Sequence, residues 1–204
     1  MRSVVLAAVL LAFVPSLMAA IPDSPFWQDI AVRIQTAPDL TNAILRKLCI
    51  DRDGIVYVLT DRGVARVYDQ ILAIDRSFRP LRSKTPVDIT TSPSGKLYYL
   101  FDDHWLSNAD NGLPLGTFPA GQYTSIAVGA DGVVWLAGPG RLAAHGNGQL
   151  RPIPVPSNFK NWKLLADETG FFFWAENQLG AFLPATGSAW DRNVPDVQAL
   201  AVRG

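Results

Sequence analysis

The residues best suited to chemistry form a short polar run, Asp102, Asp103 and His104, followed by Trp105. Two carboxylates beside an imidazole can share a proton or bind a metal ion. Side chains at successive positions of an extended chain diverge, however, so the three are not expected to converge on one ion. The other histidine, His145, has no acidic motif at ligand spacing between it and His104, which argues against a zinc site. We therefore expect no metal site and no cofactor.

Other chemical motifs fail or are missing from the sequence. The run that begins at Asn108 has the opening of a calcium loop, but the position of the bidentate carboxylate falls on Pro119. There is no Gly-x-Ser-x-Gly elbow, no His-Glu-x-x-His and no phosphate-binding glycine loop. The single cysteine, Cys49, excludes an internal disulfide, and we interpret it as a small buried apolar residue. No catalytic set can be named, so the sequence favours a protein that is not an enzyme.

A repeat of about forty residues organises the chain. Four segments share a glycine, an apolar residue two positions later and an aromatic residue three positions later. The glycines are Gly54, Gly95, Gly132 and Gly170, and the aromatic residues are Tyr57, Tyr98, Trp135 and Phe173. Each glycine sits between two apolar runs, which is typical of a tight turn between strands. The second strand of the first unit, residues 55–59, is apolar on both faces and so must be covered on both sides.

Four-stranded sheets stacked face to face satisfy this requirement, and the period fits the blade of a β-propeller. The sequence therefore predicts an all-β fold, a β-propeller with four recognisable blades and the first strand of a fifth. The predicted blades are residues 45–84, 85–122, 123–160 and 161–196, with residues 197–204 beginning the next. A single β-sandwich is the alternative, but it would not show this period.

These units resemble the blades of two-component-regulator propellers and of the related NHL-type propellers. The resemblance covers about residues 45 to 204 and implies the architecture more than the activity. Unit two departs most, with Trp105 where units one and three have glycine and an aliphatic residue, and unit four lacks an aspartate beside Gly170. Propeller lactonases of the gluconolactonase type hold a metal with a glutamate, asparagines and an aspartate. Only Glu176, of two glutamates, falls in a suitable loop here.

In a propeller, the loops between second and third strands and between blades collect on one face, at the channel mouth, where ligands bind. The alternative is that these are ordinary polar turn residues. The candidate ligand-binding residues of this face are Asp61, Arg62, Asp102, Asp103, His104, Tyr123, Trp162, Glu176 and Asn177.

The two ends of the chain carry separate signals. Arg2, an apolar run over residues 4–14 and a small-residue end predict a secretory signal peptide over residues 1–20, with an uncleaved membrane anchor as the alternative. Residues 21–44 form an N-terminal segment. Because residues 197–204 match the first strand of unit three, the ring is expected to be incomplete and the sequence truncated. The alternative is a small ring closed by residues 27–34.

The 18 basic and 18 acidic residues give zero net charge, which argues against a nucleic-acid partner. The function expected from the sequence is an exported, periplasmic or extracellular propeller module that binds a small molecule or a protein at the channel mouth. By resemblance, it would be the sensing part of a larger two-component-regulator protein, with no membrane span beyond the N-terminal segment. The alternatives are a metal-dependent lactonase, hydrolase or lyase on the same scaffold, and a secreted scaffold that binds proteins only.

Overall fold

The computed structural model describes residues 34–82, 84–109, 111–154, 163–166, 171–175, 178–183 and 188–193. The predicted signal peptide, residues 27–33 and residues 197–204 lie outside this described part. Within it, no helix is long and apolar enough to cross a membrane.

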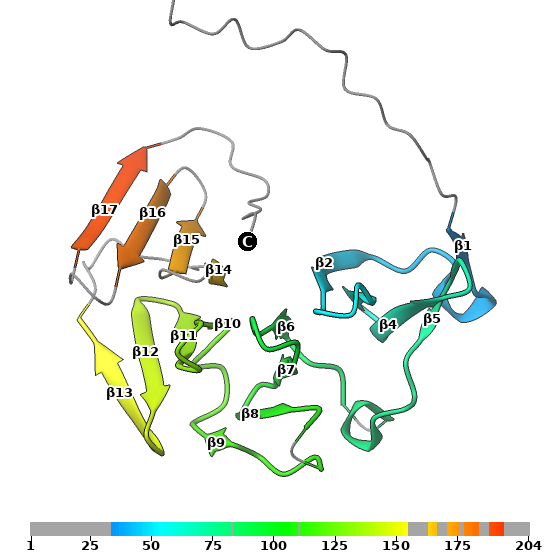
Figure 1. Ribbon diagram of the computed structural model, residues 1–204, viewed down its shortest axis with the longest axis horizontal. Helices are drawn as coiled ribbons and strands as arrows, with labels where there is room; N and C mark the ends of the chain where they lie inside the picture. The colour runs from blue at the N-terminus through cyan, green and yellow to red at the C-terminus, as the bar shows by residue number, and fades with distance from the viewer. Residues whose placement is uncertain are drawn as a thin grey trace, which may run out of the picture. The chain divides into compact units, whose positions relative to one another are not determined.

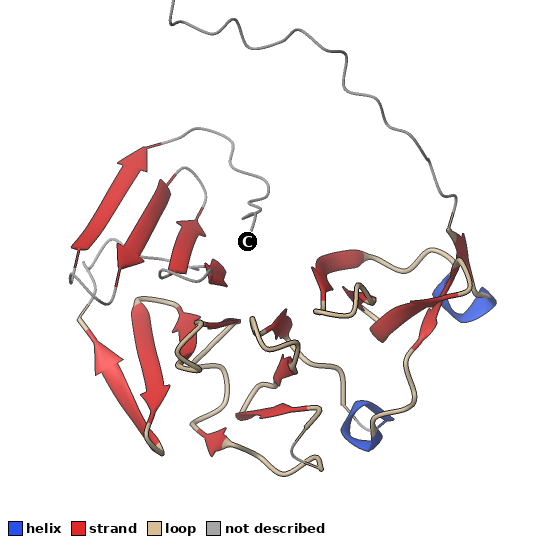
Figure 2. Cartoon of the chain, in the orientation of Figure 1, coloured by secondary structure: helices blue, strands red, loops and turns tan. Residues whose placement is uncertain are grey.

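The described chain forms four antiparallel sheets in which consecutive strands are neighbours (Figures 1 and 2). The first contains β2 (Leu45–Ile50), β3 (Val56–Thr60), β4 (Gly63–Tyr68) and β5 (Ile71–Ile74). The second contains β6 (Asp88–Thr91), β7 (Leu97–Leu100), β8 (His104–Ser107) and β9 (Gly116–Thr117). The third contains β10 (Ser125–Val128), β11 (Val134–Gly138), β12 (Arg141–Gly146) and β13 (Gln149–Ile153). The fourth contains β14 (Lys163–Ala166), β15 (Phe171–Ala175), β16 (Gln178–Leu183) and β17 (Ser188–Asn193).

Two short helices and one extra strand complete these elements. The strand β1 (Gln35–Thr36) pairs parallel to β5 and makes the first sheet five-stranded. The 3-10 helix η2 (Pro38–Leu40) precedes β2, and η3 (Arg79–Arg82) lies in the connection between the first and second sheets.

Three of the repeat glycines, Gly54, Gly95 and Gly132, lie in the turns between first and second strands. Gly54, Gly95 and Gly132 have φ values of 78°, 86° and 77°, a left-handed conformation that costs a residue with a Cβ more than it costs glycine. At the first of these turns, the Asp51 carboxylate accepts hydrogen bonds from the backbone N–H groups of Asp53 and Ile55. The sequence repeat is therefore a repeat of hairpins.

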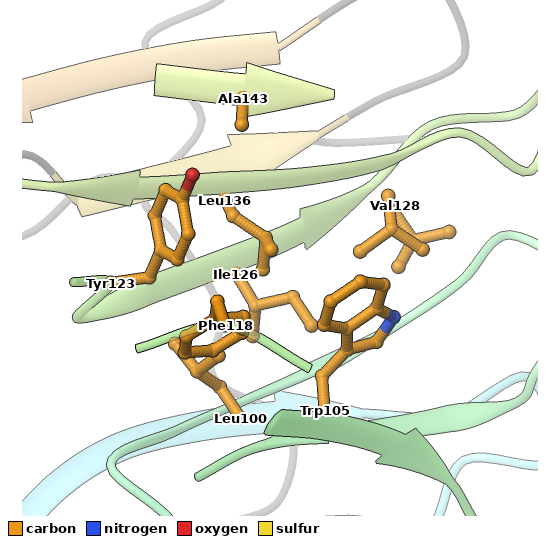
Figure 3. Close-up of a cluster of buried hydrophobic side chains, with 9 residues drawn as sticks. Leu100, Trp105, Phe118, Tyr123, Ile126, Val128, Leu136 and Ala143 are labelled. Carbon is orange, nitrogen blue, oxygen red and sulfur yellow. The ribbon is translucent and has the colours of Figure 1, made fainter. Parts of the chain in front are cut away.

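Successive sheets pack face to face through apolar clusters. Tyr57 and Leu59 of the first sheet meet Ile89 and Tyr99 of the second. A second cluster joins the second and third sheets; in Figure 3, Trp105 and Phe118 lie with Tyr123, Ile126 and Leu136. The third cluster places Trp135 of the third sheet with Leu164 and Phe173 of the fourth. Each sheet in the middle is thus covered on both faces, as the apolar second strands require. Four such sheets differ from a sandwich, which has two.

The first strands of consecutive sheets contact one another: β2 lies against β6, β6 against β10 and β10 against β14. This places the beginning of each sheet next to the beginning of the following one. In each sheet, the turn between the second and third strands lies at the same end as the start of the first strand. Polar residues of these turns and polar residues at the starts of the first strands therefore share one end. We call this end the turn face. The described candidate residues that lie there are Asp61, Arg62, Asp102, Asp103, His104 and Tyr123.

Candidate functional site

Asp61 and Arg62 form the turn between β3 and β4, and both are tied to the chain that leads into β2. The Asp61 carboxylate accepts a hydrogen bond from the Ile44 N–H at 2.8 Å. The Arg62 guanidinium donates to the Asp39 carbonyl oxygen, also at 2.8 Å. These side chains therefore stabilise the N-terminal side of the first sheet. Among the described residues, no hydrogen bond or ion pair joins them to the turn between β7 and β8.

Asp102, in that second turn, stabilises the segment that leads into the third sheet. Its carboxylate and its carbonyl oxygen both accept the Gly121 N–H, at 2.9 and 3.1 Å. This segment delivers Tyr123, whose ring packs edge-on against Phe118 with centroids 4.8 Å apart. Tyr123 is buried, and this burial raises the pKa of its phenol. Asp102 therefore stabilises the segment that positions Tyr123 at this end of the sheets.

Asp103 and His104 form a carboxylate–imidazole pair. Asp103 Oδ1 lies 2.5 Å from His104 Nδ1, and Asp103 Oδ2 lies 3.9 Å from the Lys84 ammonium nitrogen. The hydrogen bond with His104, together with the charges of His104 and Lys84, lowers the pKa of the Asp103 carboxyl. The imidazole also stacks on Phe101, with ring centroids 4.7 Å apart and planes 11° from parallel. A carboxylate at Nδ1 fixes the orientation of the ring and leaves Nε2 as the atom that can meet a ligand.

A cleft of about 400 Å³ opens beside this pair. Its lining combines an ammonium group, an imidazole, an amide and an apolar floor. The residues that line it are Pro80, Lys84, Phe101, His104, Leu106, Asn111 and Gly112. The connection through η3 forms one wall, since Pro80 lies so close to Gly112 that a Cβ there would come within 2.7 Å of the proline ring. Hydrogen-bond donors around an apolar floor suit a small polar or anionic molecule.

A second polar group, which we call the Asp88 junction, links the first strands of all four sheets. Asp88 is buried, and its carboxylate receives the Lys47 ammonium at 2.8 and 2.9 Å. Its Oδ2 also accepts hydrogen bonds from the Ser125 hydroxyl at 3.0 Å and the Ile126 N–H at 2.9 Å. The Ser125 oxygen in turn accepts the Leu164 N–H at 2.9 Å. Every strong interaction of this acid is thus made within the protein, which fits a structural role.

The structure brings some of the candidate residues together. Asp102, Asp103 and His104 share one turn and diverge, as expected, while Tyr123 lies on the segment that Asp102 holds. Trp162, Glu176 and Asn177 lie outside the described residues. Sequence reasoning missed Phe101, Lys84 and Asn111 of the cleft. Phe101 directly precedes the turn that carries His104, whereas Lys84 follows η3 and Asn111 lies in the β8–β9 loop, so no local pattern marks these last two.

Sequence reasoning also missed Asp88, although a signal was present. Lys47, Asp88, Ser125 and Lys163 each stand seven residues before a repeat glycine. A polar residue at the same place in every first strand indicates contact between those places. Metal ligation has no such basis: in the described ranges, no three side chains of the His, Cys, Asp or Glu type gather closely enough to hold an ion.

Comparison with known proteins places the fold. No protein-family model matches the sequence, and no curated protein matches it. Among solved structures, PorZ, a surface component of the type-IX secretion system of Porphyromonas gingivalis, superposes with a TM-score of 0.56 at 18% identity. The match covers 78% of this chain and 22% of PorZ. A chain described as the extracellular domain of a one component system, BT4673 from B. thetaiotaomicron, gives a TM-score of 0.56 at 14% identity over 82% of this chain and 24% of that one.

The gluconolactonase XC5397 from Xanthomonas campestris gives a TM-score of 0.54 at 11% identity, over 74% of this chain and 62% of the enzyme. The chain thus spans about a fifth to a quarter of the first two proteins and under two thirds of the third. Extracellular domains of regulatory systems, a gluconolactonase and a WD40 domain share the fold. The chain is therefore an all-β protein of the propeller type. The predicted resemblance to the propellers of two-component regulators is confirmed at the level of the fold.

Proposed function

We propose that this chain is an exported propeller module that captures a small molecule at the turn face, in the cleft beside His104. The observation that supports this most is the orientation of His104, which Asp103 and Phe101 hold at the edge of that cleft. The apolar run over residues 4–14 and the extracellular neighbours of similar fold support export. On this proposal the four sheets are four blades of a propeller, residues 197–204 begin a fifth, and the module serves as the sensing part of a larger protein.

The chemistry of the cleft favours a ligand with a carboxylate or several hydroxyl groups. Lys84 and Asn111 supply donors, His104 Nε2 supplies a donor or an acceptor, and Leu106 and Pro80 supply apolar surface. Lys84 already contacts Asp103, at 3.9 Å, which is long enough for the ammonium to turn toward a ligand anion.

Isothermal titration calorimetry with two anions, gluconate and citrate, and with neutral glucose tests the proposal. We expect one of the two anions to bind and His104→Ala to weaken that binding about tenfold or more, because a hydrogen bond involving a charged group is worth about 1.5–3 kcal/mol. His145→Ala, which removes the other imidazole of the chain, is the matched control and should bind normally. Equal binding by His104→Ala and wild type, or no binding of any probe, would refute the site.

A hydrolase of the lactonase type is the second candidate, and the Asp103–His104 pair is the observation that favours it. A carboxylate that orients an imidazole is the arrangement of a general base. The same proteins can be assayed for hydrolysis of gluconolactone with and without added Ca²⁺, Mg²⁺ or Zn²⁺. Metal-dependent turnover that is lost in Asp102→Ala, Asp103→Ala and Glu176→Ala would establish the enzyme. Binding without turnover would leave the sensing module.

Export has its own test. Residues 1–20 fused to a reporter enzyme that folds only outside the cytoplasm should give active reporter, and reversal of the leader charge by Arg2→Glu should reduce it. An inactive wild-type fusion would contradict export while leaving the cleft untouched.

A further inference from the structure

The partner of His104 at Nδ1 decides which ring nitrogen carries the hydrogen. The Asp103 carboxylate lies 2.5 Å from Nδ1, and this hydrogen bond holds the pKa of the Asp103 carboxyl below its ordinary value. An ionised carboxylate can only accept, so Nδ1 carries a hydrogen, and in the neutral ring Nε2 carries none. The nitrogen that can meet a ligand is therefore an acceptor until the ring takes up a second proton.

The described charged groups that face this imidazole come from its own turn and from the η3 connection. The turn supplies the Asp103 carboxylate, and the connection supplies the Lys84 ammonium, 3.9 Å from Asp103 Oδ2. Asp102 of the same turn is directed to a backbone N–H group instead. The β8–β9 loop contributes the neutral amide of Asn111, and β9 places the neutral Thr117 opposite this residue. With a neutral ring, one ammonium thus balances one carboxylate.

A carboxylate ligand disturbs this balance. It places a second carboxylate beside one ammonium, and its oxygen faces the lone pair of Nε2. Proton uptake at Nε2 removes both difficulties, because the ring becomes a donor and two positive groups then balance two negative ones. Phe101 favours the charged ring as well, since the negative face of its π system lies nearly parallel to the imidazole, with centroids 4.7 Å apart.

A hydroxyl ligand requires the opposite state of the ring. A sugar hydroxyl can donate to the unprotonated Nε2, so its binding needs no proton. The placement of Lys84 favours the carboxylate, because its ammonium lines the same cleft as His104 and its side chain is 59% exposed. Two nitrogen donors at one cleft suit the two oxygens of a carboxylate.

We propose that the cleft binds an organic carboxylate together with one proton, which His104 takes up from the solvent at Nε2. The site is the cleft of the proposed function, on which this inference rests, and the inference fixes the class of ligand and its dependence on pH. By linkage, capture strengthens as the solvent becomes more acidic, and the bound carboxylate in turn holds the proton on the ring. The module therefore responds to a carboxylate and to acidity together.

Isothermal titration calorimetry of the protein with gluconate, citrate and glucose tests this at about pH 8, where a free imidazole is neutral. Titrations in Tris and in triethanolamine give the number of protons taken up with the ligand, because these buffers differ in ionisation enthalpy. Both buffers are cationic and do not compete with an anion. We expect close to one proton for the anion that binds, and binding that weakens by up to about tenfold for each unit rise in pH.

Two variants assign the proton to the ring. His104→Gln keeps a hydrogen-bonding side chain that cannot titrate, so it should abolish the uptake and make the remaining binding independent of pH. Asp103→Asn should take up less than one proton, because Lys84 then has no competing carboxylate. His145→Gln, the same change at the other histidine of the chain, is the matched control and should keep the full uptake. Far-ultraviolet circular dichroism checks that all three variants fold.

The outcomes separate this inference from the proposed function. An anion that binds without proton uptake, or with an uptake that His104→Gln retains, overturns the inference and leaves the cleft as a binding site. Binding of glucose alone also overturns it, because the ligand is then not a carboxylate. Absence of binding by all three probes overturns the proposed function and this inference together.

Discussion

Two carboxylates at the same end of the second sheet have very different surroundings. Asp88 opens β6 and is buried, with a lysine, a hydroxyl and backbone N–H groups around it. Asp103 lies in the turn between β7 and β8, half-exposed, with an imidazole and a more distant lysine beside it. Both acids face a histidine or lysine, so the type of partner does not separate them.

Burial and the number of partners separate them. At Asp88 the partners belong to the protein and include Lys47 of the first sheet and Ser125 and Ile126 of the third, so the acid connects sheets. At Asp103 the solvent side stays open and the imidazole that it orients lines a cleft. The same residue types can therefore either stabilise the contacts between sheets or orient a side chain that can bind a ligand. The predictions below separate these two roles.

The largest effect is expected from Asp88→Ala. The change leaves the Lys47 ammonium, the Ser125 hydroxyl and the Ile126 N–H without their acceptor, which should cost about 3 kcal/mol in the free energy of unfolding. Urea denaturation followed by tryptophan fluorescence measures it. A loss below about 1 kcal/mol would show that the junction is not structural. Asp131→Ala, at an exposed hairpin turn, is the matched control.

Ser125→Ala should have a smaller effect of about 1–2 kcal/mol. The hydroxyl donates to Asp88 and accepts the Leu164 N–H, and the methyl group can do neither. In the double variant with Asp88→Ala, the total loss in the free energy of unfolding should be smaller than the sum of the two single losses, because the residues share a hydrogen bond. Full additivity would indicate independent sites.

A still smaller effect on the free energy of unfolding is expected from His145, which packs edge-on against Trp105. It serves as the comparison for His104, since it is an imidazole for which no carboxylate partner is described. Burial lowers the pKa of His145 from its ordinary value of 6.5. The unfolded chain therefore takes up a proton near pH 6.5 and the folded chain only at lower pH, so stability should fall as pH drops below 6.5. Denaturation at a series of pH values should show this slope in wild type. His145→Gln should remove it, and an unchanged slope would assign it elsewhere.

The smallest effect on stability is expected for Asp103→Asn, because the carboxylate is at the surface. The melting temperature should stay the same. By contrast, the pKa of the Asp103 carboxyl, measured by NMR titration, should lie below its ordinary 3.8 in wild type and rise toward it in His104→Ala. Because the pKa is lowered by folding, any stabilisation from the pair is present above pH 3.8 and is lost as pH falls below that value. A pKa that does not respond to His104→Ala would mean that the pair is absent in solution.

The fold could be predicted from the sequence because glycine turns and two-faced apolar strands repeat along the chain. Gly54, Gly95 and Gly132 occupy the left-handed turns that the repeat implies, and the residues beside them form the expected hairpins. The β1 strand could not be predicted, because Gln35 and Thr36 have no apolar pattern and pair through their backbone with β5.

The site was predictable only where its residues are neighbours in sequence. Asp103 and His104 were found because they adjoin, and their divergence from Asp102 follows from strand geometry. Lys84 and Asn111 reach the cleft through a connection and a loop whose course no local pattern specifies. Asp61 and Arg62 were grouped with the turn face by topology, but their hydrogen bonds serve the N-terminal side of the first sheet.

The Asp88 junction has a consequence for the order in which the sheets assemble. In a chain of similar repeats, any sheet could dock on any other, and such mistakes are a common cause of misassembly. Here the equivalent position changes from an ammonium at Lys47 to a carboxylate at Asp88 and a hydroxyl at Ser125. Exchanging the second sheet with the third would leave the Lys47 ammonium beside a hydroxyl group in place of a carboxylate. The junction therefore favours the native order of these neighbouring sheets over such an exchange.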